Sequence, residues 1–306
     1  MSTYQYFTVT TPIPCVAHVE INRPSKLNAF IEAMWLEFKI VFDALSHDPE
    51  IRAIILSGAG DRAFTTGLDV QAASQAGVLQ QQADKTQDVA RKAVEIKRHI
   101  TEFQDCISSV EKCEKRTLPP VSRSISCRLF CWEKQLADVH VLAVICVMHG
   151  FSLGLGMDIS ACADIRICSS DTRFAVKEVD IGLAADIGTL TRLPKVVGNF
   201  SWVKEVSLSA RIFGAEEAYR VGYVSQVLET KEKAIQAALK IAELLASKSP
   251  VAVQGTKELL NHARDHTVAD SLRYTGVWNS AAIQTSDVER AMLSGLKKTK
   301  PRFEKL

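Results

Sequence analysis

The chain has 306 residues, of which 47% are hydrophobic and 24% charged, with a mean hydropathy of +0.03, and this composition is typical of a globular protein rather than a disordered or fibrous one. Lys and Arg number 37 and Asp and Glu 35, so the net charge of +2 gives no basic surface for nucleic acid or for an anionic membrane. No apolar run reaches the roughly 18 residues that a membrane span needs, so we expect no stable membrane insertion and no nucleic-acid partner.

Strands and helices are expected to alternate through the first two thirds of the chain. The predicted elements are a half-buried strand at 16–21, a helix at 31–45, a buried strand at 52–58, a mostly helical stretch at 83–109, a strand at 144–148, a helix at 155–162 and a strand at 165–168. Helix formers then predominate at 215–221, 232–247, 252–264 and 285–298. This order predicts an α/β fold with a helical C-terminal region.

Residues 116–143 do not fit that alternation. They contain two adjacent prolines, three serines within five residues and two cysteines, without a period of 2 or 3.6. Such a loop is long for a compact domain, and it lies directly before a buried strand.

Cysteine and histidine patterns predict neither disulfides nor a metal site. The eight cysteines are scattered, which favours a reducing compartment over a disulfide framework. Cys127 and Cys131 are not followed by a second pair at zinc-ligand spacing, and HExxH is missing. We expect no signal peptide or mitochondrial presequence at the N-terminus. Residues 304–306, Glu-Lys-Leu, end like the peroxisomal tripeptide but with Glu in place of Ser, and a solvated charged tail is the alternative.

A possible nucleophile is Ser152, since residues 150–154 match G-x-S-x-G after a strand. A serine hydrolase would need a later acid and a later histidine in loops beyond strands. The later histidines, His262 and His266, lie beside a helical run instead. The alternative is a glycine-rich turn in which Ser152 bonds only backbone groups.

Three carboxylates form the second candidate site: Asp158, Glu178 and Asp186. Apolar surroundings disfavour the ionised form, which prepares such groups for proton transfer near neutral pH. The alternatives are a helix cap for Asp186 and a surface ion pair of Glu178 with Lys177 or Arg173.

Two glycine-containing loops, residues 63–70 and 150–156, each lead from a strand towards a helix. Backbone N–H groups at helix starts lack intrahelical acceptors and can stabilise developing negative charge. Together with the carboxylates, the two loops predict an oxyanion hole that faces proton-transfer groups.

These segments resemble the enoyl-CoA hydratase/isomerase (crotonase) superfamily over nearly the whole chain. The resemblance rests on Asn22-Arg23-Pro24 with Asn28-Ala29, residues 64–69, His149-Gly150 with Gly154-Leu155-Gly156, and residues 162–166. Residues 177–190 closely resemble the Δ3,5-Δ2,4-dienoyl-CoA isomerases of that superfamily, and residues 247–255 and 264–266 extend the similarity. Hydratases of the family have glutamates at the positions of Asp158 and Glu178 and lack the acid at Asp186.

The resemblance implies a crotonase-type spiral of repeated β-β-α units in residues 1–206, followed by a helical oligomerisation region, residues 207–306. It implies a homotrimer or hexamer, an acyl-CoA thioester as substrate, and no cofactor beyond the CoA of that substrate. The implied reaction converts 3,5-dienoyl-CoA to 2,4-dienoyl-CoA in unsaturated fatty-acid β-oxidation. The expected location is peroxisomal, with mitochondrial or cytoplasmic as alternatives.

The resemblance also implies residue roles. Glu178 removes the C2 proton, Asp186 protonates C6, and Asp158 sets the charge near the intermediate. The N–H groups of Leu68 and Leu155 hold the dienolate oxygen, although family members often have glycine at the position of Leu155. The remaining substrate-binding positions of the first loop are Thr66, Gly67, Asp69 and Val70.

The family pattern is restored when Lys115 is joined to Val144, so we interpret residues 116–143 as translated non-coding sequence, such as a retained intron. A tolerated surface excursion is the alternative, because long loops cost little entropy. Three other functions stay open: an enoyl-CoA hydratase or Δ3-Δ2 isomerase, the Ser152 hydrolase, and a catalytically dead homologue whose core the insert distorts.

Overall fold

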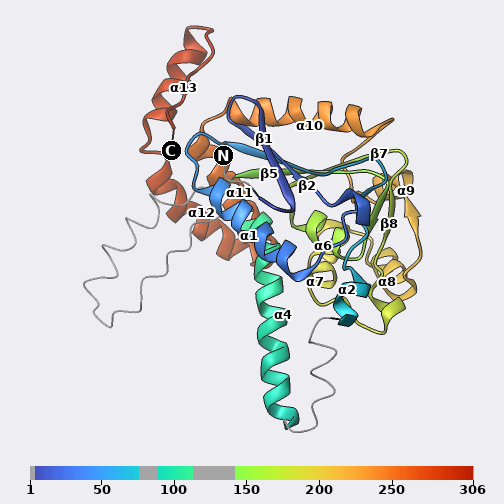
Figure 1. The fold of residues 1–306 in the computed structure, drawn as a ribbon. Helices are drawn as coiled ribbons and strands as arrows, with labels where there is room; N and C mark the ends of the chain where they lie inside the picture. Colours follow the sequence, from blue (N-terminus) through green and yellow to red (C-terminus); the bar gives the residue numbers. More distant parts are fainter. Residues whose placement is uncertain (1–3, 76–87, 113–141, 306) are drawn as a thin grey trace.

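The computed structural model describes residues 4–75, 88–112 and 142–305, which form two sheets with helices packed around them (Figure 1). The larger sheet has the order β1 (Phe7–Ile13), β2 (Val16–Ile21), β3 (Ala53–Gly58), β5 (Ala143–Met148), β7 (Ile165–Ser169) and β10 (Gln226–Leu228). Only the β1–β2 pair in it is antiparallel. The smaller sheet has the order β4 (Ala63–Thr65), β6 (Phe151–Leu153), β8 (Arg173–Ala175) and β9 (Phe213–Gly214).

The chain winds between these sheets in repeated turns. Each turn places one strand in the larger sheet, the next in the smaller sheet, and then a helix: β3, β4 and α2 (Val70–Gln75), then β5, β6 and α6 (Leu155–Cys162). The third turn has β7 and β8 followed by the 3-10 helix η2 (Glu178–Ile181). The predicted β-β-α spiral is therefore confirmed.

Two further segments flank these turns. The N-terminal one has the 3-10 helix η1 (Pro24–Lys26) and α1 (Glu32–Ser46), whereas α4 (Val89–Lys112) lies between the first and the second turn. The later one has α7 (Thr189–Val196), α8 (Phe200–Ser209), α9 (Ala215–Arg220), α10 (Lys231–Ala246), α11 (Pro250–Asp265), α12 (Val268–Ala282) and α13 (Ser286–Leu296). The predicted helical C-terminal region is present. It also contains β9 and β10, which complete the smaller and the larger sheet, and α10, which covers one face of the larger sheet (Figure 1).

The period of two in the buried strands explains why the larger sheet has a core on each face. In β5, Val144, Cys146 and Met148 face the main core with α1 and α4, whereas Ile145 and Val147 face α10. The α10 side is lined by Ala234, Ala238 and Ala242, small residues at helical spacing that let the helix approach the sheet closely.

The predicted insert, residues 116–143, lies outside the described residues except at its end. Leu142 is buried, and Ala143 begins β5, where it pairs with Ala53 of β3. The proposal that this segment is translated non-coding sequence stays a prediction, as does the domain division at residue 206.

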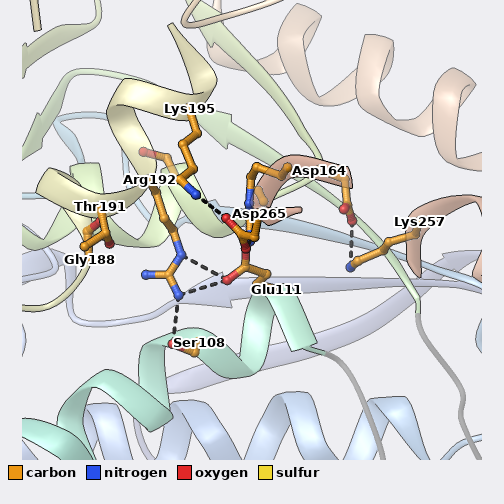
Figure 2. Close-up of polar contacts among 12 residues, drawn as sticks. Ser108, Glu111, Asp164, Gly188, Thr191, Arg192, Lys195, Lys257 and Asp265 are labelled. Carbon is orange, nitrogen blue, oxygen red and sulfur yellow. Dashed lines mark hydrogen bonds and ion pairs between the residues drawn. The ribbon is translucent and has the colours of Figure 1, made fainter. Parts of the chain in front are cut away.

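Lys257 of α11 secures the point where the chain enters β5 (Figure 2). Its ammonium group donates to the Leu142 carbonyl oxygen and to Asp164 Oδ2, each over 2.8 Å, and the same Asp164 oxygen accepts from the Val144 amide over 2.7 Å. The Lys257 side chain is only 6% exposed. A partly buried ion pair thus joins the C-terminal helices to the central strand.

We predict that Lys257→Met lowers the free energy of unfolding by about 3 kcal/mol, because it leaves the Asp164 carboxylate and the Leu142 carbonyl without their partner. Urea denaturation measures this change. Lys240→Met, at an exposed position of α10, is the control and should change it by less than about 0.5 kcal/mol. Equal effects of the two substitutions would contradict a structural role for the pair.

Candidate active site

The two glycine-containing loops lie against each other, because β4 and β6 are neighbouring parallel strands. Gly67 has φ of +91°, and a methyl group on its Cα would lie 2.9 Å from the Leu153 carbonyl oxygen and 3.3 Å from the Leu155 nitrogen. Only glycine suits this position. Within the described part of the chain, the Leu68 and Leu155 amides donate no hydrogen bond. Two adjacent loops therefore offer two free donors.

Glu178 lies beside the second of these loops. A methyl group on Gly154 would lie 3.2 Å from Glu178 Oε1, and Gly154 directly precedes Leu155. Glu178 Oε2 is buried and has no hydrogen-bond partner among the described residues. Lys177 pairs with Asp180 instead, over 2.7 Å, so the alternative of an ion pair between Glu178 and Lys177 is not formed.

The pKa of Glu178 is raised to about 7, mainly because burial disfavours its charged form and further because the charges of Asp158 and Asp186 repel a third. A carboxylate with this pKa exchanges protons near neutral pH, as a general base requires.

Asp158 lies on the first turn of α6 and is 2% exposed. Its Oδ1 accepts from the Thr189 amide over 2.6 Å and from the Thr189 hydroxyl over 2.7 Å. Burial raises the pKa of Asp158 to about 6, while the two Thr189 hydrogen bonds and the charge of Arg192 oppose the increase. Asp158 thus retains much of its negative charge at neutral pH despite its burial.

Asp186 lies in the loop between η2 and α7 and is partly exposed. Its backbone carbonyl accepts from Gln104 of α4 over 2.5 Å. Burial raises the pKa of Asp186, and its own backbone amide and the charge of His99 partly offset that increase. The Asp186 side chain does not cap α7, which was the predicted alternative. Asp158 does so instead, because it accepts the hydrogen bond of the Thr189 amide at the start of α7.

The three predicted carboxylates therefore lie close enough for their charges to interact. The charge of Asp158 acts on Glu178, and that of Asp186 acts on both. The partner that sequence reasoning missed is Thr189; its only signal is its position after a glycine at the start of a helix.

The other predicted loop residues shape the first loop. Asp69 Oδ1 accepts from the Ala72 amide over 3.0 Å and Oδ2 pairs with Arg23 over 2.8 Å; these contacts lower the pKa of Asp69, the Ala72 bond most strongly. The Thr66 amide donates to the Leu27 carbonyl oxygen, and Val70 is exposed. Asp69 and Thr66 hold the backbone around Leu68.

Ser152 has no histidine partner in the described residues. Its hydroxyl is buried and makes no hydrogen bond there. His262 and His266 stack on each other, and their ring nitrogens contact Ser271 and the His262 carbonyl oxygen, respectively. The hydrolase triad is not assembled.

A groove of about 1260 Å³ lies away from the carboxylates, between the end of α6, the helices α10 and α11, and residues 300–303. Asp158, Glu178 and Asp186 do not line it. In residues 4–75, 88–112 and 142–305 we find no group of three potential metal ligands, and none of the helices is both long and apolar enough to cross a membrane.

Comparisons with known proteins find similarity to one family. The family profile described as "Enoyl-CoA hydratase/isomerase" matches residues 14–101 and 132–305. The chain is 40% identical over 289 residues to "Delta(3,5)-Delta(2,4)-dienoyl-CoA isomerase, mitochondrial" of Homo sapiens, covering 94% of this chain and 78% of that protein. It is 36% identical over 291 residues to "Delta(3,5)-Delta(2,4)-dienoyl-CoA isomerase, peroxisomal" of Arabidopsis thaliana, covering 95% and 93%.

A solved structure extends the similarity of fold. The enoyl-CoA hydratase of Bacillus anthracis superposes with a TM-score of 0.78 at 21% identity, over 98% of this chain and 99% of that one. At this identity the likeness concerns the fold.

We predict that Glu178→Gln increases the free energy of unfolding relative to the wild type, and that this increase is larger at pH 8 than at pH 5. The raised pKa of Glu178 gives a stability contribution that is complete below its ordinary value of 4.5 and is lost as the pH rises through about 7. Glutamine removes that loss, so the gain in free energy of unfolding should be larger at pH 8, by on the order of 1 kcal/mol. Urea denaturation at both pH values tests this.

The control is Glu243→Gln, at an exposed position of α10, where no difference between the two pH values is expected. The same gain at pH 5 and pH 8 in Glu178→Gln would show that the pKa of Glu178 is not raised.

Proposed function

Because this chain belongs to the enoyl-CoA hydratase/isomerase family, we propose that it converts 3,5-dienoyl-CoA to 2,4-dienoyl-CoA in the β-oxidation of unsaturated fatty acids. The names of the relatives at 36–40% identity support this reaction. The observation that carries the proposal in the structure is that a third carboxyl group, Asp186, lies close enough to Asp158 and Glu178 to interact with both.

The reaction needs two proton-transfer groups. A proton leaves C2 and another arrives at C6, and these carbons are too far apart for one stationary carboxylate to serve both. The C2–H electrons enter the conjugated system, both double bonds shift, and a new C–H bond forms at C6. Glu178 takes the first proton and Asp186 supplies the second; proton exchange with solvent then restores both groups.

The raised pKa values suit these roles. A base with a pKa of about 7 is partly ionised and still basic at neutral pH. Burial also raises the pKa of Asp186, so this carboxyl group takes up a proton more readily than a solvated one and can then donate it. The charge of Asp158 beside Glu178 raises the pKa of Glu178 and so makes it a stronger base.

The thioester oxygen gains negative charge when C2 loses its proton, and the amides of Leu68 and Leu155 would stabilise it. Their lack of acceptors in the described residues and the contact between their loops support this role. Leucine at position 155 keeps the required N–H. Loss of one such donor typically costs about 10²–10³ in rate.

The alternative of an enoyl-CoA hydratase fits the residues less well. The resemblance places a second glutamate of hydratases at the position of Asp158, whose shorter side chain here is bonded to Thr189. The solved hydratase supports the shared fold. Isomerisation redistributes electrons within the substrate, so we propose no cofactor, and CoA enters as part of the substrate.

The location of the protein is proposed as peroxisomal, with mitochondrial or cytoplasmic as alternatives. The name of the Arabidopsis thaliana relative contains the word "peroxisomal", and that of the Homo sapiens relative contains "mitochondrial". Leu306, the last residue of the tripeptide, lies outside the described residues. Lys305 pairs with Glu50, and the Glu304 carbonyl accepts from Arg52 over 3.1 Å.

We predict that the purified protein develops the ultraviolet absorbance of a conjugated 2,4-dienoyl thioester when given 3,5-dienoyl-CoA. Asp186→Asn should lower kcat by at least about 10², because amide cannot deliver the C6 proton. Ser152→Ala removes a hydroxyl that has no hydrogen-bond partner among the described residues, and it should keep kcat within about twofold of the wild type. An unchanged kcat in Asp186→Asn would reject the two-acid assignment.

We also propose that the C-terminal helices mediate assembly into a homotrimer or hexamer. Apolar side chains are exposed on them: Val268, Leu272 and Val277 of α12, and Met292 and Leu296 of α13. Leu272, for example, is 67% exposed. Several exposed apolar side chains on neighbouring helices are typical of a surface that another subunit covers.

Leu272→Glu is expected to shift the protein towards smaller assemblies, because a charge cannot be buried unpaired in an apolar interface. Light scattering after size-exclusion chromatography measures the mass. Gln236→Glu, at an exposed position of α10, adds the same charge elsewhere and should leave the mass unchanged. An unchanged mass for Leu272→Glu would place the interface elsewhere.

A further inference from the structure

Thr189 holds one oxygen of Asp158 with two hydrogen bonds. It is the first residue of α7 and is fully buried. Its amide and its hydroxyl both donate to Asp158 Oδ1, over 2.6 and 2.7 Å. The N-cap of α7 is Gly188, which has no side chain, so a carboxylate from α6 caps this helix in its place.

The position of Thr189 is itself fixed from α4. Arg192, one turn further along α7, donates to Glu111 Oε2 over 2.9 and 3.0 Å and to the Ser108 hydroxyl over 2.9 Å (Figure 2). A methyl group on Gly188 would lie 2.0 Å from Arg192 Nη1. The guanidinium group held by Glu111 and Ser108 therefore packs directly on the backbone that leads into Thr189.

We propose that Thr189 is a positioning residue whose hydroxyl keeps Asp158 ionised beside Glu178 and thereby sets the basicity of Glu178. The proposal rests on the function proposed above. Hydrogen bonds to a carboxylate favour its charged form, and a charged Asp158 repels a second charge on Glu178. Loss of the hydroxyl would reverse both effects: Asp158 would hold its proton to higher pH, and Glu178 would release its proton at lower pH.

Other charged and titratable groups also face these two carboxylates. They are Arg192 of α7 with its partner Glu111 of α4, Asp186 of the preceding loop, Cys162 of α6 and Tyr223. None of them is changed by a substitution at Thr189. A purely structural role for Thr189 is separable too, because the Thr189 amide, through which Asp158 caps α7, remains whatever the side chain.

The direct test is a carboxyl titration that needs no substrate. Protein labelled with ¹³C at the Asp and Glu carboxyl groups is titrated by NMR as the wild type, Thr189→Val and Thr189→Ser, and Asp158→Asn and Glu178→Gln assign the two signals. In Thr189→Val we expect the Asp158 midpoint to rise by on the order of one pH unit and the Glu178 midpoint to fall, because one hydrogen bond to a charged group is lost. Thr189→Ser restores the hydroxyl and should titrate as the wild type does.

Two results would overturn the proposal: a folded Thr189→Val protein in which neither midpoint moves, or a Thr189→Ser protein that behaves as Thr189→Val does. The titration decides this even when the wild type does not turn over 3,5-dienoyl-CoA, which would reject the proposed function alone.

The catalytic consequence is measured separately with an active wild type. The acid limb of kcat/KM reports the essential base of the free enzyme, so in Thr189→Val it should move to lower pH together with the Glu178 midpoint. Thr189→Ser should keep the wild-type profile. A limb that stays in place while the Asp158 midpoint moves would refute a role for Thr189 in setting the base.

Discussion

The cost of ionising three carboxyl groups in one poorly solvated place is the constraint on which the proposed chemistry of this protein depends. Burial raises the pKa of Asp158, Glu178 and Asp186, and their mutual repulsion adds to the increase for Glu178. The two Thr189 hydrogen bonds and the charge of Arg192 limit the increase for Asp158, whose pKa is about 6, whereas the charges of Asp158 and Asp186 add to the increase for Glu178, whose pKa is about 7. Groups that would be fully ionised in water become exchangeable at neutral pH, at the expense of folded-state stability.

The fold creates that place by repetition. Each β-β-α turn ends a short strand of the smaller sheet at the same edge, so the loops that contain Leu68 and Leu155 meet there, and the chain continues from β8 into Glu178. Gly67 packs closely against the backbone of Leu153 and Leu155, so the backbone itself fixes the position of the Leu68 amide relative to the Leu155 amide. Rigid donors and tuned acids in one site are what enolate chemistry requires.

Support for the site comes from outside the repeated turns. α4 supplies Glu111 and Ser108, which hold Arg192 against the start of α7, and Gln104, which holds the Asp186 carbonyl. α11 adds Arg264 on the second oxygen of Glu111 and Lys257 on the entry to β5. The C-terminal helices thus stabilise the same elements that carry the carboxylates, although they contribute none of them.

The sequence by itself determined the elements with a strong period and the residues with distinctive chemistry. Buried strands such as residues 144–148 and the helix at 155–162 were predicted at nearly their observed bounds, because periodicity is local. The three-residue strands β4, β6 and β8 were not predicted, since short strands exist only through their partners. The helix α12 was not predicted either. Tertiary structure also decided which acid caps α7: Asp158 rather than Asp186. Hydrogen-bond partners 31 residues apart, and the burial that shifts a pKa, arise only when distant segments pack together.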